Sequence, residues 1–259
     1  MGIFDSGVGG LTVLRRVAER LPHESIVYLG DTARVPYGTK SAETVVRYAK
    51  ACANVLIDRG ISLLVVACNT ASAYALEALR HELTIPVIGV IDPGARRAVR
   101  STRSGRIGVI GTKGTISSGA YQNAIAALQP DHAVFGQPCP LFVPLAEEGW
   151  LEGEVPLSVA RTYLRPLLDH DIDTLVLGCT HYPLLKDVIA EAAGPGVTLI
   201  DSAEATAETV ATYLQKQDNS PANQESRFHY LVTDDPDSFA RVGRGFLGYA
   251  IDTVEWVDI

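Results

Sequence analysis

Two stretches of this 259-residue chain resemble each other, LLVVACNT at 63–70 and TLVLGCTH at 174–181. Each is a run of small and β-branched apolar residues that ends in a cysteine, a polar residue and a predicted helix. Such runs are typical of buried parallel strands, so Cys68 and Cys179 are expected at the carboxyl ends of two strands. Ligands bind at that edge of open α/β sheets. The pattern therefore predicts one acid and one base on opposite sides of a single substrate.

Strand and helix patterns alternate along most of the chain. This alternation predicts βαβ units and hence an α/β fold of doubly wound parallel sheets. We expect strands at 2–4, 25–29, 63–67, 87–90, 106–110, 133–135, 174–177 and 198–200, and helices including 11–21, 41–59, 71–83, 158–170 and 184–193.

The internal repeat extends beyond the two cysteines. The stretch GIFDSGVGG at 2–10 resembles GVIGTKGT at 108–115, at a spacing close to that between Cys68 and Cys179. We therefore predict two homologous halves: a discontinuous first domain (1–91 and 201–259) and a second domain (92–200). The polar stretch 215–227 is interpreted as a solvated loop or linker, followed by a further strand–helix–strand pattern.

Composition and charge exclude several classes of protein. The chain is 47% hydrophobic and 20% charged, as is ordinary for a globular protein. Its formal charge of −8 argues against nucleic-acid or anionic-membrane partners. No apolar run approaches the roughly 20 residues that span a bilayer, and the N-terminus lacks a signal-peptide pattern. We expect a cytoplasmic protein whose thiols stay reduced.

The four cysteines do not predict a metal site. They form no CxxC pair, and Cys179 with His181 lacks a matching second pair of ligands. Cys52 lies in a predicted helix and is expected to be a small buried residue. Cys139, between two prolines, receives no role. We therefore expect no bound metal.

The glycine-rich turn DSGVGG at 5–10 follows the first strand. Its glycines let the backbone approach a ligand, and amides at the start of the next helix favour an anion. A structural turn and a carboxylate or phosphate cradle both fit this pattern. A nucleophilic Asp5, as in phospho-aspartyl enzymes, fits it too.

Other polar candidates follow predicted strands or lie in loops beside them. Asp31 fits a turn cap, and the residues directly after the two cysteines fit helix N-caps that also bind a carboxylate or ammonium group. A lone histidine is often structural, but His181 is close enough to Cys179 to tune its protonation. The remaining candidates are Ser6, Tyr37, Gly38, Asn69, Thr70, Glu147, Glu148 and Thr180.

The thiols need an unusual environment to act as bases. A free thiol has a pKa of about 8.5, so a general base requires a lower value. We expect helix N-termini after Cys68 and Cys179, and a protonated His181, to lower it. A carboxylate such as Asp5 would oppose that effect.

Three classes of function fit these residues. A two-thiol racemase or isomerase needs both cysteines in equivalent positions. A cysteine hydrolase needs only Cys179 with His181, so it leaves Cys68 unexplained. A module that binds a metabolite or gyrase needs no turnover, and the acidic charge gives no support for direct DNA contact.

The motifs together resemble the glutamate racemase family of the cofactor-independent aspartate/glutamate racemases. The two cysteine motifs alone leave aspartate and glutamate open as substrates, whereas DSGVGG, PYG and GCTHYPLL together favour glutamate. The C-terminal fifth matches loosely. The matching segments are GIFDSGVGGLTVL (2–14), YLGDTARVPYG (28–38), VVACNTASA (65–73), GRIGVIGTKGTISSGAY (105–121), CPLFVPLAEEG (139–149) and LVLGCTHYPLL (175–185).

The resemblance assigns roles to individual residues. It implies that Cys68 removes the α-proton of D-glutamate and Cys179 that of L-glutamate. Asp5, Asp31, His181 and Glu147 would assist, with Glu148 as the alternative to Glu147. The implied substrate contacts are Asp5, Ser6, Tyr37, Gly38, Asn69, Thr70, Thr180 and His181.

The resemblance also implies two similar domains in a pseudo-two-fold relation, with the active site between them. It implies no pyridoxal phosphate, metal or nucleotide, no requirement for nucleic acid, and L- or D-glutamate as the small-molecule substrate. The family's product, D-glutamate, feeds bacterial peptidoglycan synthesis, and thus cell-wall biogenesis and cell shape. Members of the family are often homodimers, so a homodimer is expected here.

Overall fold

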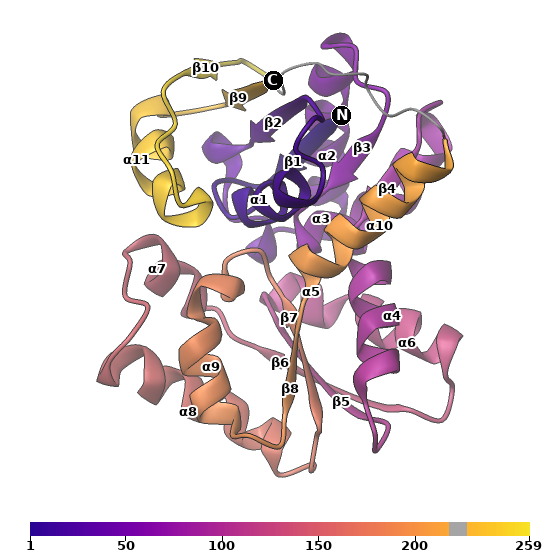
Figure 1. The fold of residues 1–259 in the computed structure, drawn as a ribbon, viewed down its shortest axis with the longest axis vertical. Coiled ribbons are helices and arrows are strands. Elements are labelled where there is room, and N and C mark those ends of the chain that lie inside the picture. Colours follow the sequence, from indigo (N-terminus) through magenta and orange to yellow (C-terminus); the bar gives the residue numbers. More distant parts are fainter. Residues whose placement is uncertain (218–226) are drawn as a thin grey trace.

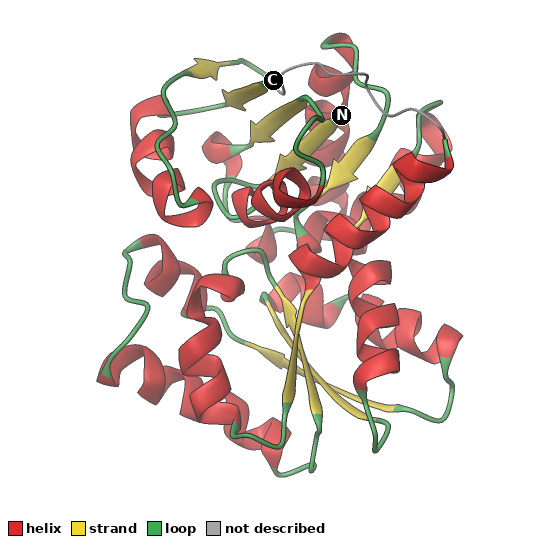
Figure 2. Ribbon diagram, in the orientation of Figure 1, coloured by secondary structure: helices red, strands yellow, loops and turns green. Residues whose placement is uncertain are grey.

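The computed structural model describes residues 1–217 and 227–259, which form two parallel β-sheets covered by helices (Figures 1 and 2). One sheet has the order β10-β9-β2-β1-β3-β4, and the other the order β6-β5-β7-β8. The predicted α/β class with parallel sheets is therefore confirmed. The strands are β1 (Gly2–Asp5), β2 (Ile26–Gly30), β3 (Leu64–Val66), β4 (Val87–Gly89), β5 (Arg106–Gly111), β6 (Ala133–Pro138), β7 (Thr174–Gly178), β8 (Thr198–Asp201), β9 (Phe228–Val232) and β10 (Val254–Trp256).

Helices connect the strands and lie against both faces of the sheets. Their bounds are α1 (Leu11–Arg20), α2 (Ala42–Asp58), α3 (Asn69–Glu82), α4 (Ile91–Ser101), α5 (Lys113–Ser117), α6 (Ala120–Leu128), α7 (Phe142–Glu147), α8 (Glu154–Leu168), α9 (Lys186–Ala193), α10 (Ser202–Lys216) and α11 (Pro236–Leu247). Short 3₁₀ turns are η1 (Thr32–Arg34), η2 (Tyr37–Thr39) and η3 (Tyr182–Leu185).

The apolar runs of the sequence arise because the strands are buried on both faces. In β3, Leu64 and Val66 pack in the cluster under α2 and α3, whereas Val65 packs on the opposite face with residues of α1. In β7, Val176 faces the α4 and α6 cluster, and Leu175 and Leu177 face the other side. Alternate side chains of a strand point to opposite faces, so a sheet covered on both sides needs apolar residues at every position.

The two sheets repeat one strand order. In the first, the neighbours run β2-β1-β3-β4, and in the second β6-β5-β7-β8. The chain passes from the first sheet to the second through α4 and returns through α10 (Figure 1). Because β3 and β7 hold equivalent places, Cys68 and Cys179 follow equivalent strands. The internal repeat read from the sequence is thus present in the topology.

Several element limits differ from the predicted ones. Helix α3 begins at Asn69 rather than 71 because the Cys68 side chain is itself the N-cap and accepts from the Ala71 N–H. Helix α8 begins at Glu154 rather than 158, with Pro156 in its first turn, where proline is tolerated. The predicted strand–helix–strand pattern at the C-terminus is confirmed as β9, α11 and β10. Most of the predicted linker at 215–227 lies outside the described residues.

The helix predicted at 184–193 is confirmed as α9, but the prediction that an α-helix N-terminus directly follows Cys179 is wrong. The chain instead forms a turn through Thr180 and His181 and then the 3₁₀ turn η3, before α9 begins at Lys186. Pro183 occupies the start of η3, where its missing N–H costs no hydrogen bond.

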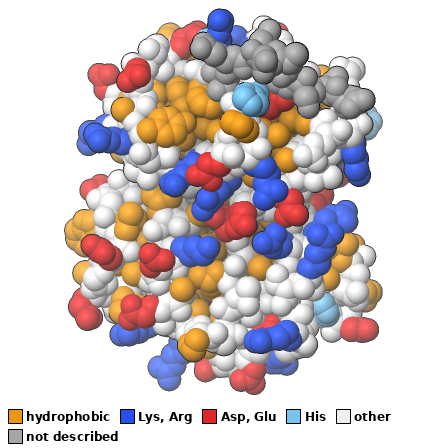
Figure 3. Space-filling view, viewed as in Figure 1, with side chains coloured by type: hydrophobic (Ala, Val, Ile, Leu, Met, Phe, Trp, Pro, Cys, Tyr) orange, Lys and Arg blue, Asp and Glu red, His pale blue; other side chains and the backbone are white. Residues whose placement is uncertain are grey.

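The surface carries intermixed charges. Figure 3 shows side chains of both signs across the face formed by α1, α4 and α10. There Arg16 pairs with Glu19, and Arg97 with Glu208. In the described part of the chain, no helix is both long enough and apolar enough to cross a membrane.

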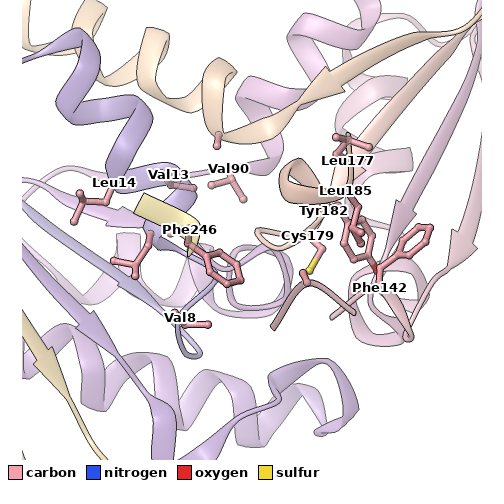
Figure 4. Close-up of a cluster of buried hydrophobic side chains, with 14 of the residues drawn as sticks. Val8, Val13, Leu14, Val90, Phe142, Leu177, Cys179, Tyr182, Leu185 and Phe246 are labelled. Atoms are coloured by element: carbon pink, nitrogen blue, oxygen red, sulfur yellow. The ribbon is translucent and has the colours of Figure 1, made fainter. Parts of the chain in front are cut away.

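One hydrophobic cluster joins the two sheets. Figure 4 shows Val8, Val13, Leu14 and Phe246 on one side of this cluster, with Cys179 and its neighbours on the other. A polar contact accompanies it, because the Thr12 hydroxyl lies 2.9 Å from the Thr180 carbonyl oxygen and 3.0 Å from that of Gly9. The Thr12 hydroxyl therefore links α1 by a hydrogen bond to the turn that follows Cys179.

We predict that Thr12→Val lowers the free energy of unfolding by about 1–3 kcal/mol, because the buried carbonyl of Thr180 loses a donor while the side-chain shape is kept. Urea unfolding measures this change. The matched control is Thr212→Val, whose exposed hydroxyl bonds only the Glu208 carbonyl of its own helix, and it should change stability by less than about 0.5 kcal/mol. Equal effects of the two substitutions would contradict the proposed link.

Candidate active site

The turn between β1 and α1 touches both cysteine segments. The Ser6 hydroxyl lies 3.8 Å from Cys68 Sγ, on the side of β3. A Cβ built on Gly9 would lie 2.4 Å from the Thr180 hydroxyl and from two atoms of the His181 ring, on the side of β7. The backbone can approach His181 this closely because residue 9 is glycine. The predicted candidates Asp5, Ser6, Thr180 and His181 therefore lie around one turn.

Cys68 is a buried thiol with few polar neighbours. Its side chain is 6% exposed, accepts from the Ala71 N–H at 3.5 Å and points its own hydrogen toward Ser6. Burial and the nearby Asp5 raise the pKa of Cys68 to about 12, and the amide of Ala71 offsets this only in part. The expected lowering of this pKa by the helix N-terminus is thus wrong, because desolvation outweighs the helix amides.

Cys179 lies beside a charged histidine. Its Sγ is 3.9 Å from His181 Nδ1, and His181 Nε2 is 2.8 Å from Glu147 Oε1. Burial disfavours the imidazolium, but hydrogen bonds with Cys179 and Glu147 outweigh it and raise the pKa of His181 to about 10. At neutral pH the ring is therefore protonated, and it places a positive charge 3.9 Å from Cys179 Sγ.

Asp5 lies on the same turn as Ser6 and is fully buried. Its Oδ2 accepts from the Gly7 N–H at 3.0 Å, and its Oδ1 lies 3.5 Å from the Thr180 hydroxyl. Burial raises the pKa of Asp5, while His181 and the backbone amides of the turn oppose that rise. The Asp5 carboxylate is thus near Cys68 and also near Thr180, the residue that follows Cys179.

Asp31 is held in a separate network beneath the turn. Its carboxylate accepts two bonds from Arg34 Nε, at 2.8 and 2.9 Å, one from Thr233 at 3.0 Å and one from the Tyr37 hydroxyl. Its side chain is fully buried, and each oxygen has at least two donors. The network fixes Tyr37, which is also buried.

A cluster of three hydroxyls joins the two sheets near Gly38. The Oγ1 of Thr70 lies 2.9 Å from that of Thr112 and 3.1 Å from that of Thr115, and the latter two are 3.1 Å apart. A Cβ on Gly38 would lie 2.5 Å from Thr112 Cβ, so η2 packs directly on this cluster. Thr112 and Thr115 were not predicted from sequence. The resemblance of GVIGTKGT at 108–115 to the turn after β1 is the sequence signal that could have identified them.

Asn69 has an unfilled polar group. Its Oδ1 accepts from the Tyr121 hydroxyl at 2.7 Å, whereas its buried Nδ2 has no hydrogen-bond partner among the described residues. Buried polar groups are nearly always paired, so an unpaired amide beside Cys68 indicates a position for a ligand.

A cleft of about 210 Å³ opens beside the β1–α1 turn, lined by Gly7, Val8 and Glu147 and by side chains of α11 such as Phe239. It lies next to the Glu147–His181 pair. The contribution of α11 was not predicted from sequence. Among the described residues, no group of His, Cys, Asp and Glu side chains is arranged to hold a metal ion.

The structure distinguishes two adjacent carboxylates, that of Glu147 at the end of α7 and that of Glu148, which follows it. Glu147 contacts His181, whereas Glu148 forms no ion pair in the described ranges.

The pKa of His181 is raised from 6.5 to about 10, so its protonation contributes stability that is complete below pH 6.5 and is lost as the pH rises through about 10.

We therefore predict that Glu147→Gln lowers the free energy of unfolding by about 1–2 kcal/mol near pH 6.5, because it removes a charge-assisted hydrogen bond. The difference from the unaltered protein should close as the pH rises through about 10, above which His181 is neutral in both. Urea unfolding at several pH values measures it. Glu148→Gln is the matched control and should show no such pH-dependent difference. A deficit that persists undiminished above pH 10 would contradict the assignment.

Comparison with known proteins identifies the family. The model for "Asp/Glu/Hydantoin racemase" matches residues 9–210. The chain is 58% identical to a glutamate racemase of Geobacter metallireducens over 260 residues, covering 100% of this chain and 96% of that one.

Solved structures agree with this match. A glutamate racemase isoform of Bacillus anthracis superposes with a TM-score of 0.94 at 42% identity, covering 100% of this chain and 97% of that one. The glutamate racemase of Francisella tularensis, solved with D-glutamate, gives 0.93 at 38% identity, with 99% and 96% covered. This chain thus belongs to the Asp/Glu/hydantoin racemase family, in the branch formed by the glutamate racemases.

Proposed function

We propose that this protein interconverts L- and D-glutamate without a cofactor, with Cys68 and Cys179 as the two acid–base groups. The observation that carries the proposal is the equivalence of the two thiols. Each is buried directly after the corresponding strand of a repeated sheet. Cys68 contacts Ser6 of the β1–α1 turn, and Cys179 contacts His181, which packs against that turn. The many relatives named glutamate racemase support glutamate as the substrate.

A two-base racemase needs one thiol and one thiolate at the same time. The two environments support this difference. Burial and Asp5 keep Cys68 protonated, and the protonated His181 beside Cys179 favours a thiolate there. In this state the site is ready for L-glutamate: Cys179 takes the α-proton from one face, and the Cys68 thiol gives its proton to the other face. The reverse reaction starts from the opposite pair of protonation states.

The intermediate of this reaction is a carbanion that needs electrostatic stabilisation. The buried Nδ2 of Asn69, the amides at the start of α3 and the Thr180 hydroxyl supply donors near the two thiols. Because such donors are already oriented and shielded from water, they favour developing negative charge on the substrate's α-carboxylate. We assign Asp5 and Ser6 to the substrate's ammonium group, since Asp5 is a buried carboxylate between the thiols.

The hydroxyl cluster of Thr70, Thr112 and Thr115 fits the side-chain carboxylate of glutamate. Three hydroxyls that contact one another can turn their protons toward a bound anion, and the backbone of Tyr37–Gly38 packs against them. We propose that Asp31 acts through this element as a positioning residue, because it holds the Tyr37 hydroxyl and η2 in place.

The cellular role follows from the reaction. We propose that the enzyme supplies D-glutamate for peptidoglycan synthesis in the cytoplasm, where reducing conditions keep both thiols free. We propose two domains, 1–91 with 201–259 and 92–200, with the substrate between them, and a homodimer as the assembly.

Cys179, His181 and Glu147 also form the nucleophile–base–carboxylate sequence of a cysteine hydrolase. A hydrolase of that kind does not need Cys68. The equivalence of the two thiols therefore favours racemisation, and the role of Cys68 separates the two functions.

We predict that Cys68→Ser and Cys179→Ser each reduce kcat/KM for glutamate by about 10²-fold or more, because a serine hydroxyl is a far weaker acid–base group at neutral pH. Circular dichroism of L-glutamate in deuterated water, with deuterium at Cα read by mass spectrometry, measures the reaction. Since the equilibrium constant of a racemisation is one, each variant must lose kcat/KM equally for both enantiomers.

The control for this experiment is Cys139→Ser, a buried cysteine with no role in the site, which should retain activity. If Cys68→Ser remains active, the single-thiol chemistry of Cys179 replaces the racemase proposal. If aspartate is racemised in preference to glutamate, the mechanism stands and the substrate assignment fails.

We also predict that Thr112→Val raises KM for both enantiomers about tenfold with little change in kcat, because a contact with the side-chain carboxylate is equally strong in ground and transition states. Steady-state kinetics measures this split. Thr212→Val, on the exposed face of α10, is the matched control. An unchanged KM would remove the hydroxyl cluster from the binding site.

A further inference from the structure

We propose that Tyr121, a residue outside the predicted site, is the positioning residue that sets the orientation of the Asn69 amide and so presents its NH₂ group to the substrate. The inference rests on the proposed function for the identity of the ligand, which is the α-carboxylate of glutamate. It concerns a contact between α3 and α6, which follow strands of different sheets (Figure 1).

Asn69 needs such a partner because its side chain can be turned in two ways. The two ends of a primary amide have nearly the same shape, but one end accepts hydrogen bonds and the other donates them. In the structure Oδ1 accepts from the Tyr121 hydroxyl at 2.7 Å, and Nδ2 is buried with no partner in residues 1–217 and 227–259. A flipped amide would turn Nδ2 toward the hydroxyl and present an acceptor to the substrate's carboxylate, which would repel it.

Tyr121 is itself held in one place. Its ring lies against Gly94 of α4 and Gly178 of β7, where an added Cβ would come within 3.2 and 3.1 Å of ring carbons. Its side chain is 1% exposed, and burial raises its pKa, so the hydroxyl stays protonated as a donor. Gly178 directly precedes Cys179, and Gly94 belongs to the helix that carries the chain between sheets.

The arrangement joins the two cysteine segments through one hydroxyl group. Asn69 directly follows Cys68, and Tyr121 packs on the residue before Cys179. The amide of Asn69 is therefore oriented from the half of the molecule that carries the other thiol. A hydrogen-bond donor that is already oriented stabilises a buried anion more than a freely rotating donor does, because the donor need not reorganise when charge develops.

The test is Tyr121→Phe, which removes the hydroxyl and keeps the ring. We expect kcat/KM for glutamate to fall about tenfold, the effect of one hydrogen bond to a charged group, with a fall in kcat because the oriented donor stabilises charge that develops in the transition state. Tyr230→Phe is the matched control, because it removes another buried tyrosine hydroxyl, which bonds Tyr249 rather than Asn69. It should leave both constants unchanged.

A double-mutant cycle with Asn69→Ala separates positioning from general stability. If Tyr121 acts through Asn69, adding Tyr121→Phe to Asn69→Ala should lower kcat/KM by less than about twofold. A tenfold loss of kcat/KM that persists in the Asn69→Ala background would overturn the proposal, as would a kcat/KM within twofold of normal in Tyr121→Phe alone.

A measurement without turnover keeps this test independent of the reaction. The side-chain ¹⁵N amide signal of Asn69, assigned by its loss in Asn69→Ala, should shift in Tyr121→Phe and stay in place in Tyr230→Phe. An unmoved signal in folded Tyr121→Phe would overturn the positioning role. If the unaltered protein does not racemise glutamate but the signal shifts as expected, the proposed function fails and the contact between Tyr121 and Asn69 stands.

Discussion

The close approach of the β1–α1 turn to the segment after Cys179 is the constraint on which the site depends. Gly9 lies where any Cβ would overlap Thr180 and His181, and Gly10 lies equally close to the Asp5 side chain. A larger residue at position 9 would move the His181 ring and, with it, the neighbour of Cys179. The position of the His181 ring beside Cys179 thus depends on a segment that supplies no thiol, because only glycine lets the backbone of the turn approach the Thr180 and His181 side chains this closely.

A repeated fold supplies two equivalent thiols, but the residues beside them make the two different. In the first segment Cys68 is followed by Asn69 and Thr70, and in the second Cys179 is followed by Thr180 and His181. The neutral Thr70 thus corresponds to the ionisable His181. Together with Asp5 near Cys68, this exchange gives one thiol a negative neighbour and the other a positive one. The asymmetry that the proposed two-base chemistry needs would thus arise from a single altered position and one buried carboxylate.

Much of the fold could be predicted because buried parallel strands leave a clear apolar pattern. The strands before Cys68 and Cys179 are continuous apolar runs, and the repeat in sequence corresponds to a repeat in strand order. The residues after these strands could be predicted as site candidates for the same reason. The helix expected after Cys179 could not be excluded, because Pro183 fits the first turn of an α-helix as well as the 3₁₀ turn that forms.

Other parts of the site depend on tertiary contacts that no local pattern reports. Asp31 resembles a free strand-end carboxylate in sequence, but the 3₁₀ turn that follows brings Arg34 back onto it. Thr112 is an ordinary N-cap of α5 by sequence, and only the packing of the two sheets brings its hydroxyl to Thr70. Burial reversed the expected effect on Cys68 because desolvation depends on the whole surrounding structure.

The hydroxyl cluster has a thermodynamic consequence for the assembly of the site. Thr70 belongs to the segment after β3, whereas Thr112 and Thr115 follow β5 in the other sheet. If the two halves separate to admit a ligand, this cluster no longer exists as one binding surface. A ligand that contacts all three hydroxyls therefore has differential affinity for the closed arrangement, and its binding free energy is coupled to the closing equilibrium. Both thiols are about 95% covered, so the proposed reaction would need an opening in each cycle, and the rate of that motion would set an upper limit on turnover.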